Sequence, residues 1–375
     1  MKDEEDRQKS STPERISAQG LSSLSEVDFI HKLRRRVEDK VSSASSFILH
    51  PSSLIRGIGD DAAVFKSFLG NDVVVTTDLL VEDVDFRRDT TRPDLLGHKA
   101  LAVSLSDIAA MGARPRWALM SIGVPDAIWS SEFLDSFYSG FFELATRYGV
   151  TLIGGDVSRT PDKIIIDSIL IGETPRAGAV FRSGAEPGDQ IFVTGSLGTA
   201  AAGLRLLERG ARLQPPPQTP QLDGEPDERH RLDNLLLRQL RPEPRVGWGL
   251  LLGEQQLATA MIDISDGLSS DLNHLCTESK VGALIDAAAI PIDPLVTELT
   301  GRRALDPLML ALHGGEDFEL LFTVKPEMVA KLPTRVDGVS LTRLGEIREA
   351  SHGVRISEGS RSWDLEPGGW EHFKG

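Results

Sequence analysis

The chain has 375 residues, of which 40% are hydrophobic and 26% charged, a globular balance that excludes wholesale disorder, collagen or a coiled coil. It carries 56 acidic and 41 basic residues, and the net charge of −15 disfavours nucleic acid or a membrane as main partner. Cys276 is the one cysteine, which excludes an internal disulfide and a cysteine-rich zinc site. No apolar run is long enough to span a bilayer and no signal-peptide pattern is present, so we expect a cytoplasmic protein.

Residues 1–25 are polar and lack apolar periodicity, so we expect them to form a tail. Beyond them, β-branched runs alternate with segments of helical period. We predict strands at 73–77, 164–172, 190–195, 261–265 and 318–324, and helices at 93–111, 131–148 and 199–209.

Two interruptions divide this pattern. A stretch with three consecutive prolines, residues 212–230, predicts an exposed loop. Pro175 interrupts the alternation of strands and helices near residues 174–182. We therefore expect a mixed α/β (α+β) protein with two domains, residues 26–174 and 175–375.

Carboxylates recur beside glycine or small residues at the ends of apolar runs. One of them, Asp107, shares a helical face with Leu96, Ala100 and Val103, so we expect it to have an ion partner. Any one such carboxylate alone is typical of a turn or a helix cap. Several converging on one cleft would suit a magnesium-bound nucleoside triphosphate. The segments are IGDDAAVF (58–65), TTDLLVEDVDF (76–86), SLSDIAAMGA (104–113), IGGDVSR (153–159), DISDGLSSD (263–271) and GGEDFEL (314–320).

Other chemistries find little support in the sequence. There is no Gly-Lys dipeptide for a phosphate-binding P-loop, no Gly-x-Ser-x-Gly and no His-Glu-x-x-His. Residues 57–62 superficially match a dinucleotide fingerprint, but two acidic residues and a following strand speak against it. His98 and His274 are interpreted as surface or locally hydrogen-bonded residues.

An ordered series of motifs resembles the thiamine-monophosphate kinase family, of the ATP-binding superfamily that includes aminoimidazole ribonucleotide synthetase. The match runs from about residue 54 to residue 373. Its motifs are IGDDAAV, TTDLLVEDVDF, KALAVSLSDIAAMGARP, LIGGDVSR, FRSGAEPGDQIFVTGSLG, RPEPR, DISDGLSSDLNHL, ALHGGEDFELLFTV and GGWEHF.

The resemblance implies a two-domain, PurM-like fold, with an N-terminal barrel-forming domain that pairs as a homodimer and a C-terminal α/β sandwich. It implies transfer of the γ-phosphoryl group of ATP to thiamine phosphate with several Mg²⁺ ions. The implied metal ligands are Asp61, Thr76, Thr77, Asp78, Asp107, Asp156, Asp263 and Asp266. The implied nucleotide contacts are Tyr138, Gly155, Asp156, Arg182 and Ser265, and the substrate contacts are Glu316 and Trp370. Among these, Asp107, Asp156, Asp263 and Arg182 are the candidate catalytic residues.

The residue types fit this chemistry. A phosphate monoester has a second pKa of about 6, so the attacking oxygen is mostly deprotonated at neutral pH and no strong base is needed. The protein then has only to position the two phosphate-bearing substrates and to neutralise their charge. Arg182 is a candidate residue for binding a phosphate group, with a surface ion pair as the alternative. Trp370 is a candidate for stacking on the cationic thiazolium, with core closure as the alternative.

One motif departs from the family. Where the family usually has Val-x-Gly-x-His-Phe, this chain has Asp83 and Asp85 in VEDVDF, and Asp85 becomes a candidate substrate contact. Two other functions stay open: an aminoimidazole ribonucleotide synthetase-like enzyme and a non-catalytic magnesium-nucleotide binding protein. The GGWEHF ending favours the kinase over the synthetase, and the intact aspartates speak against loss of catalysis.

Overall fold

The computed structural model describes residues 28, 30–35, 53–67, 70–129, 131–213, 228–301 and 306–371. The predicted tail, residues 1–25, lies outside this part of the chain, as does most of the proline-rich stretch 212–230. The last three residues of that stretch, 228–230, belong to a helix instead of a loop. No helix among the described residues is long and apolar enough to cross a membrane.

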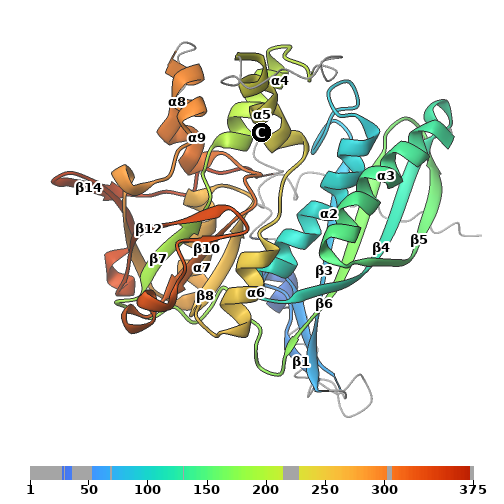
Figure 1. Cartoon of the computed structure of the whole chain (residues 1–375). Coiled ribbons are helices and arrows are strands. Elements are labelled where there is room, and N and C mark those ends of the chain that lie inside the picture. The colour runs from blue at the N-terminus through green and yellow to red at the C-terminus, as the bar shows by residue number, and fades with distance from the viewer. Residues whose placement is uncertain are drawn as a thin grey trace, which may run out of the picture.

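The first half of the chain forms a six-stranded sheet in the order β1-β2-β3-β6-β4-β5. Helices α2 (Pro93–Ala110) and α3 (Ser131–Tyr148) lie against one face of it (Figure 1). In β3 and β6, buried and more exposed residues alternate, as expected for a sheet with one covered face. The strands are β1 (Leu54–Arg56), β2 (Ala63–Lys66), β3 (Asn71–Val81), β4 (Arg114–Pro125), β5 (Thr151–Thr160) and β6 (Ile165–Pro175).

The second half forms another mixed sheet, in the order β14-β13-β9-β12-β7-β10-β8, with β11 paired to β12. Its strands are β7 (Gln190–Thr194), β8 (Ala260–Ile264), β9 (Gly282–Asp286), β10 (Glu319–Val324), β11 (Arg335–Val336), β12 (Val339–Arg348), β13 (Val354–Glu358) and β14 (Arg361–Asp364). Its helices are α4 (Thr199–Glu208), α5 (Glu228–Leu240), α6 (Val246–Glu254), α7 (Leu268–Ser279), α8 (Pro294–Gly301) and α9 (Pro307–His313). Short 3₁₀ turns cover Asp126–Ile128, Ala287–Ala289, Pro326–Lys331 and Ala350–His352.

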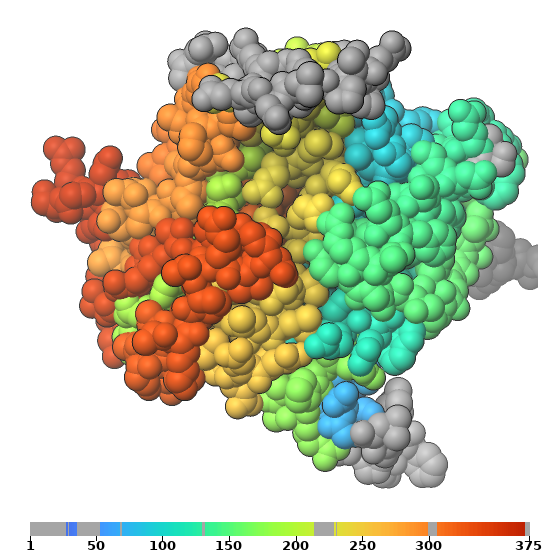
Figure 2. Space-filling model, in the orientation of Figure 1, coloured from blue at the N-terminus to red at the C-terminus, as the bar shows by residue number. Residues whose placement is uncertain are grey.

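The predicted mixed α/β fold is confirmed, and each predicted strand and helix is present with shifts of a few residues at its ends. The apolar stripe expected on α3 is buried at Phe137, Phe141, Leu144 and Ala145. The two halves meet along a continuous seam in the space-filling view (Figure 2). One hydrophobic core extends across this seam, because it contains residues of α2 and α3 together with Trp248 and Phe322 of the second half.

Helix α2 is buried almost all round, not along one stripe as its sequence suggested. Glycines allow this close packing on two sides. A Cβ at Gly97 would lie 1.8 Å from the Phe137 carbonyl oxygen of α3, and one at Gly249 of α6 would lie 2.2 Å from the Ala109 carbonyl oxygen. His98 is also buried, with Nε2 2.8 Å from the Pro242 carbonyl oxygen, so its hydrogen-bonded interpretation holds and its surface interpretation is wrong.

Candidate active site

Three carboxylates from distant parts of the sequence meet at the seam between the two halves. Asp61 comes from the loop between β1 and β2, Asp107 from α2 and Asp263 from β8. One carboxylate oxygen from each lies within 4.8 Å of the others, and we call this group the acidic cluster. Oxygens in such an arrangement are the ligands that a hard divalent cation prefers.

The hydrogen bonds of the acidic cluster leave one of its fully buried oxygens without a partner among the described residues. Asp61 Oδ1 accepts from Arg182 Nη2 at 2.5 Å, whereas the buried Oδ2 of Asp61 finds no partner among the described residues. Asp263 Oδ2 accepts from Ser106 Oγ at 2.6 Å, and Asp107 accepts from the Thr76 hydroxyl. A buried carboxylate oxygen without a donor is costly, so the cluster is suited to receive a cation.

The raised pKa values of the buried carboxylates also indicate a site suited to a cation. Burial, with the Asp61 charge, raises the pKa of Asp263 to about 7. Burial, together with the charges of Asp78, Asp263 and Asp61, holds the pKa of Asp107 well above its usual range. Asp78 lies beside the cluster on β3, and burial raises its pKa to about 6 although Ser104 Oγ donates to it at 2.6 Å. Arg182 alone therefore does not neutralise these carboxylates.

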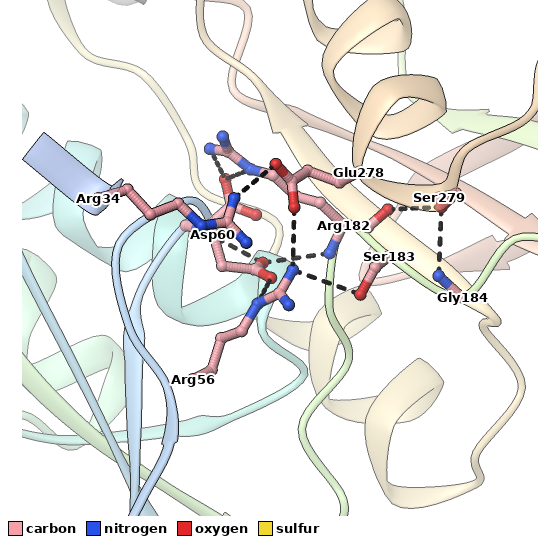
Figure 3. Close-up of polar contacts among 9 residues, drawn as sticks. Arg34, Arg56, Asp60, Arg182, Ser183, Gly184, Glu278 and Ser279 are labelled. Atoms are coloured by element: carbon pink, nitrogen blue, oxygen red, sulfur yellow. Dashed lines mark hydrogen bonds and ion pairs between the residues drawn. The ribbon is translucent and has the colours of Figure 1, made fainter. Parts of the chain in front are cut away.

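Arg182 is fixed by a network of charged residues around Asp60 (Figure 3). Its backbone N–H donates to Asp60 Oδ1 at 3.1 Å, and Arg56 Nε lies 2.6 Å from Asp60 Oδ2. Arg56 and Arg34 both pair with Glu278 of α7, at 3.4 and 2.9 Å. The ion-pair interpretation of Arg182 thus describes its contact with Asp61, and its side chain is only 24% exposed instead of lying free on the surface.

A second carboxylate group lies at the start of α7. One ligand atom from each of Asp266, Asp271 and His274 lies within 4.8 Å of the others. Asp271 Oδ2 accepts from the backbone N–H groups of Asp266 and Gly267 at 3.2 and 3.0 Å, so this carboxylate also fixes the turn that carries Asp266. Burial, with the nearby Asp266 charge, raises the pKa of Asp271 well above its usual range.

A cavity of about 590 Å³ opens between the two halves, and we call it the interdomain cavity. Residues of β3, the following turn and α2 line one part of it, and residues of α4, α5 and the C-terminal segments line the rest. Six residues that the sequence singled out line it together: Asp78, Asp85, Ser265, Asp266, Glu316 and Trp370. Asp78 and Asp266 thus connect the cavity to the two carboxylate groups.

The three candidate substrate contacts are held in different ways. Asp85 Oδ2 accepts from the Val81 backbone N–H at 2.7 Å, so the carboxylate stabilises its own turn. Trp370 is 57% exposed, and its backbone N–H donates to the Asp266 carbonyl oxygen at 3.1 Å. Glu316 has a φ of 66°, a left-handed backbone that non-glycine residues adopt at a cost.

Four predicted site residues lie elsewhere. Thr77 Oγ1 donates to Asp167 at 2.6 Å, on the sheet face opposite the buried Thr76 and the helices. Ser121 is paired with both Asp167 and Asp156, which places Asp156 on this same face. Tyr138 and Gly155 also lie outside the interdomain cavity, on α3 and β5.

Comparison with known proteins identifies the family. Residues 59–174 match the family described as AIR synthase related protein, N-terminal domain, and residues 186–357 match AIR synthase related protein, C-terminal domain. A thiamine-monophosphate kinase of Bacillus subtilis (strain 168) is 37% identical over 354 residues, which cover 94% of this chain and 100% of that protein. The chain belongs to the thiamine-monophosphate kinase family.

Other members of the thiamine-monophosphate kinase family agree. The enzyme of Escherichia coli (strain K12) is 38% identical over 320 residues, covering 84% of this chain and 91% of that protein. A solved structure of AaThiL complexed with AMPPCP and TMP superposes with a TM-score of 0.76 at 31% identity, covering 94% of this chain and 98% of that one. The resemblance seen in the sequence and its PurM-like fold are therefore confirmed.

Three residues of this kinase-family site were not singled out from the sequence. Asp60 and Asp271 lie inside the quoted motifs IGDDAAVF and DISDGLSSD, in which the candidate ligands are Asp61 and, in the second motif, Asp263 and Asp266. Lys99 is the first residue of the quoted motif KALAVSLSDIAAMGARP and lines the interdomain cavity from α2. No periodic signal could mark Lys99, because α2 is buried on nearly every side.

Proposed function

We propose that this chain, a phosphotransferase by family, transfers the γ-phosphoryl group of ATP to thiamine phosphate in the cytoplasm, giving thiamine diphosphate and ADP. One observation carries the proposal. The interdomain cavity, lined by the candidate substrate contacts, includes Asp266 of the second carboxylate group and Asp78, which lies beside the acidic cluster. A substrate with a ring end and a phosphate end matches such a site.

Phosphoryl transfer to a phosphate acceptor requires the protein mainly to position the two substrates. The acceptor phosphate already carries a deprotonated oxygen near neutral pH, so direct in-line attack on the γ-phosphorus needs no general base. The guanidinium of Arg182, held beside Asp61, is placed to bind a phosphate group, for which its geometry is suited. The residues of this site neutralise and orient two polyanions.

Magnesium ions would be held by the acidic cluster and by carboxylates beside it. The unpartnered Asp61 Oδ2 and the raised pKa values of Asp107 and Asp263 fit such ions. When bound, Mg²⁺ supplies positive charge that offsets the phosphates. We retain Thr76, Thr77, Asp78, Asp156 and Asp266 as further ligands, and Tyr138, Gly155 and Ser265 as nucleotide contacts.

We also propose that the chain forms a homodimer through its first sheet. The face of that sheet away from α2 and α3 presents large apolar side chains, with Leu79 60% exposed and Trp117 and Ile165 each 38% exposed. Strand register places these residues on the same face as Thr77 and Asp156. Light scattering should therefore give twice the monomer mass, and Leu79→Glu should reduce it to the monomer mass.

The test of the activity is an assay with ATP and Mg²⁺ that compares thiamine phosphate, thiamine and formylglycinamidine ribonucleotide as substrates. Thiamine diphosphate formed from thiamine phosphate alone supports the kinase. Conversion of the ribonucleotide would favour the synthetase-like alternative. ATP binding with no conversion of any of the three would favour the non-catalytic alternative.

A further inference from the structure

Lys99 is a buried lysine inside the interdomain cavity. It is only 2% exposed, and its Nζ lies 2.6 Å from Glu316 Oε1 and 3.2 Å from the Asp85 carbonyl oxygen. An ammonium group is costly to bury unless it is paired. The pair joins α2 of the first half to the Gly-Gly-Glu-Asp segment of the second, so it spans the two walls of the cavity.

The other oxygen of Glu316 is held from a different helix. Gln239 of α5 is 5% exposed and lines the same cavity, and its Nε2 donates to Glu316 Oε2. Because an ionised carboxylate only accepts hydrogen bonds, the amide nitrogen of Gln239 must face it. Lys99 and Gln239 therefore fix both oxygens of one carboxylate.

The backbone of Glu316 is fixed as well. Its φ of 66° is unfavourable for a residue with a side chain, and Phe318 nearby has a φ of 49°. The Glu316 backbone N–H donates to the Ser265 carbonyl oxygen at 2.7 Å, next to the turn that carries Asp266. Such backbone conformations persist where surrounding contacts over-determine them, and they concentrate at ligand sites.

We infer that Lys99 and Gln239 are positioning residues that orient the Glu316 carboxylate toward the ring end of the substrate and so set specificity for it. This inference rests on the proposed function. The Lys99–Glu316 pair is neutral, so it does not attract the acceptor phosphate away from Arg182. Each Glu316 oxygen keeps a further lone pair, which can accept from an amino group such as that of the pyrimidine.

The experiment is a double-mutant cycle on Lys99 and Glu316, read as KM and kcat for thiamine phosphate and for ATP. Lys99→Met should raise KM for thiamine phosphate by about tenfold to a hundredfold, the usual cost of an unpaired partner. The values of kcat and of KM for ATP should stay within about threefold, because a positioning residue acts on ground-state binding. In a Glu316→Gln background the same Lys99 change should cost less than about threefold, since its target carboxylate is gone.

Gln239→Met removes the donor to the other oxygen of Glu316 and should also raise KM for thiamine phosphate. This variant tests the inference independently if Lys99→Met does not fold. Matched controls are Lys325→Met, at an exposed pair with Glu186, and Gln190→Met, whose side chain bonds the Gly188 carbonyl oxygen. Both controls should leave all four constants unchanged.

The outcomes separate the two proposals. Equal losses from Lys99→Met with and without the Glu316 carboxylate would overturn the inference, as would a parallel rise in KM for ATP. If wild-type protein forms thiamine diphosphate while Lys99→Met and Gln239→Met match it, only the inference fails. If wild-type protein neither converts nor binds thiamine phosphate, the proposed function itself fails.

Discussion

Asp263→Asn should move stability and activity in opposite directions. In the absence of metal, the Asp263 carboxylate is buried beside Asp61, and its pKa is raised from 3.8 to about 7. A shift of about three units corresponds to ~4 kcal/mol of unfavourable free energy for the ionised form above that pKa. The neutral amide removes this cost, and it can still accept from Ser106.

That shift already includes the attraction to Arg182, and the amide still bears its own cost of burial, so we expect the variant to be more stable by ~2 kcal/mol at a pH of about 8. For a domain of about 150–250 residues, a gain of ~2 kcal/mol should raise the melting temperature by about 4–8 °C. Turnover should fall below detection, because one proposed ligand of the cation is gone. The measurement is thermal unfolding in EDTA, with a kinase assay on the same preparation.

A melting temperature below that of the wild type in EDTA would refute the reasoning, because it would mean that the carboxylate stabilises the metal-free fold. Full activity would refute the metal assignment. Asp317→Asn is a matched control away from the cluster. Asp317 is also buried with a pKa raised to about 7, but its oxygens accept from Gly198 and Ala200 N–H groups, so the amide should lower stability.

Four further outcomes are expected. Wild-type protein in EDTA should lose stability as the pH rises from about 5 to about 8. The raised pKa values of Asp263 and Asp78 make the folded state bind more protons than the unfolded chain in that range. Added Mg²⁺ should reverse the loss in a series of melting curves. Arg245→Met should cost about 3 kcal/mol in urea unfolding, since buried Glu319 then keeps only its longer ion pair with Arg238, at 3.7 Å, and a cost below about 1 kcal/mol would contradict this. Gly155→Ala should lower the melting temperature sharply, because its Cβ would lie 1.9 Å from the Met120 carbonyl oxygen. Gly149→Ala meets no neighbour, so as a control it should show only the smaller cost of a side chain at a φ of 67°. Asp85→Asn keeps an acceptor for the Val81 N–H and should leave KM for thiamine phosphate within about twofold, so a larger change would indicate direct substrate contact.

Local periodicity was sufficient to predict five of the strands and three of the helices, but not the remaining elements of the described chain. The spacing of Phe137, Phe141 and Leu144 marks one side of α3, and the β-branched runs mark β3, β6 and β8, because each signal depends only on neighbours in the chain. The convergence of Asp61, Asp107 and Asp263 came from the family resemblance, since no local pattern says which strand ends meet across two domains.

Other features depend on tertiary structure that the sequence does not spell out. The burial of α2 on nearly all sides follows from its position between two domains, and it hides Lys99 from any amphipathic analysis. The separation of Thr76 from Thr77 follows from strand alternation, which places neighbouring residues of one strand on opposite faces of the sheet. Asp271 was indistinguishable from an ordinary helix cap until its burial was known.

The glycine contacts of α2 have a consequence for the choice of acceptor. With backbone against backbone at Gly97 on one side and at Gly249 on the other, the helix has no room to slide. Lys99 and Asp107 are eight residues apart on it, which fixes a rise of about 12 Å between them along the helix axis. If Lys99 marks the ring-binding end, as inferred above, an acceptor that lacks the phosphate, such as thiamine, would place its rings there and end short of any cation held by Asp107. Discrimination between thiamine and thiamine phosphate would then depend on the length of the acceptor.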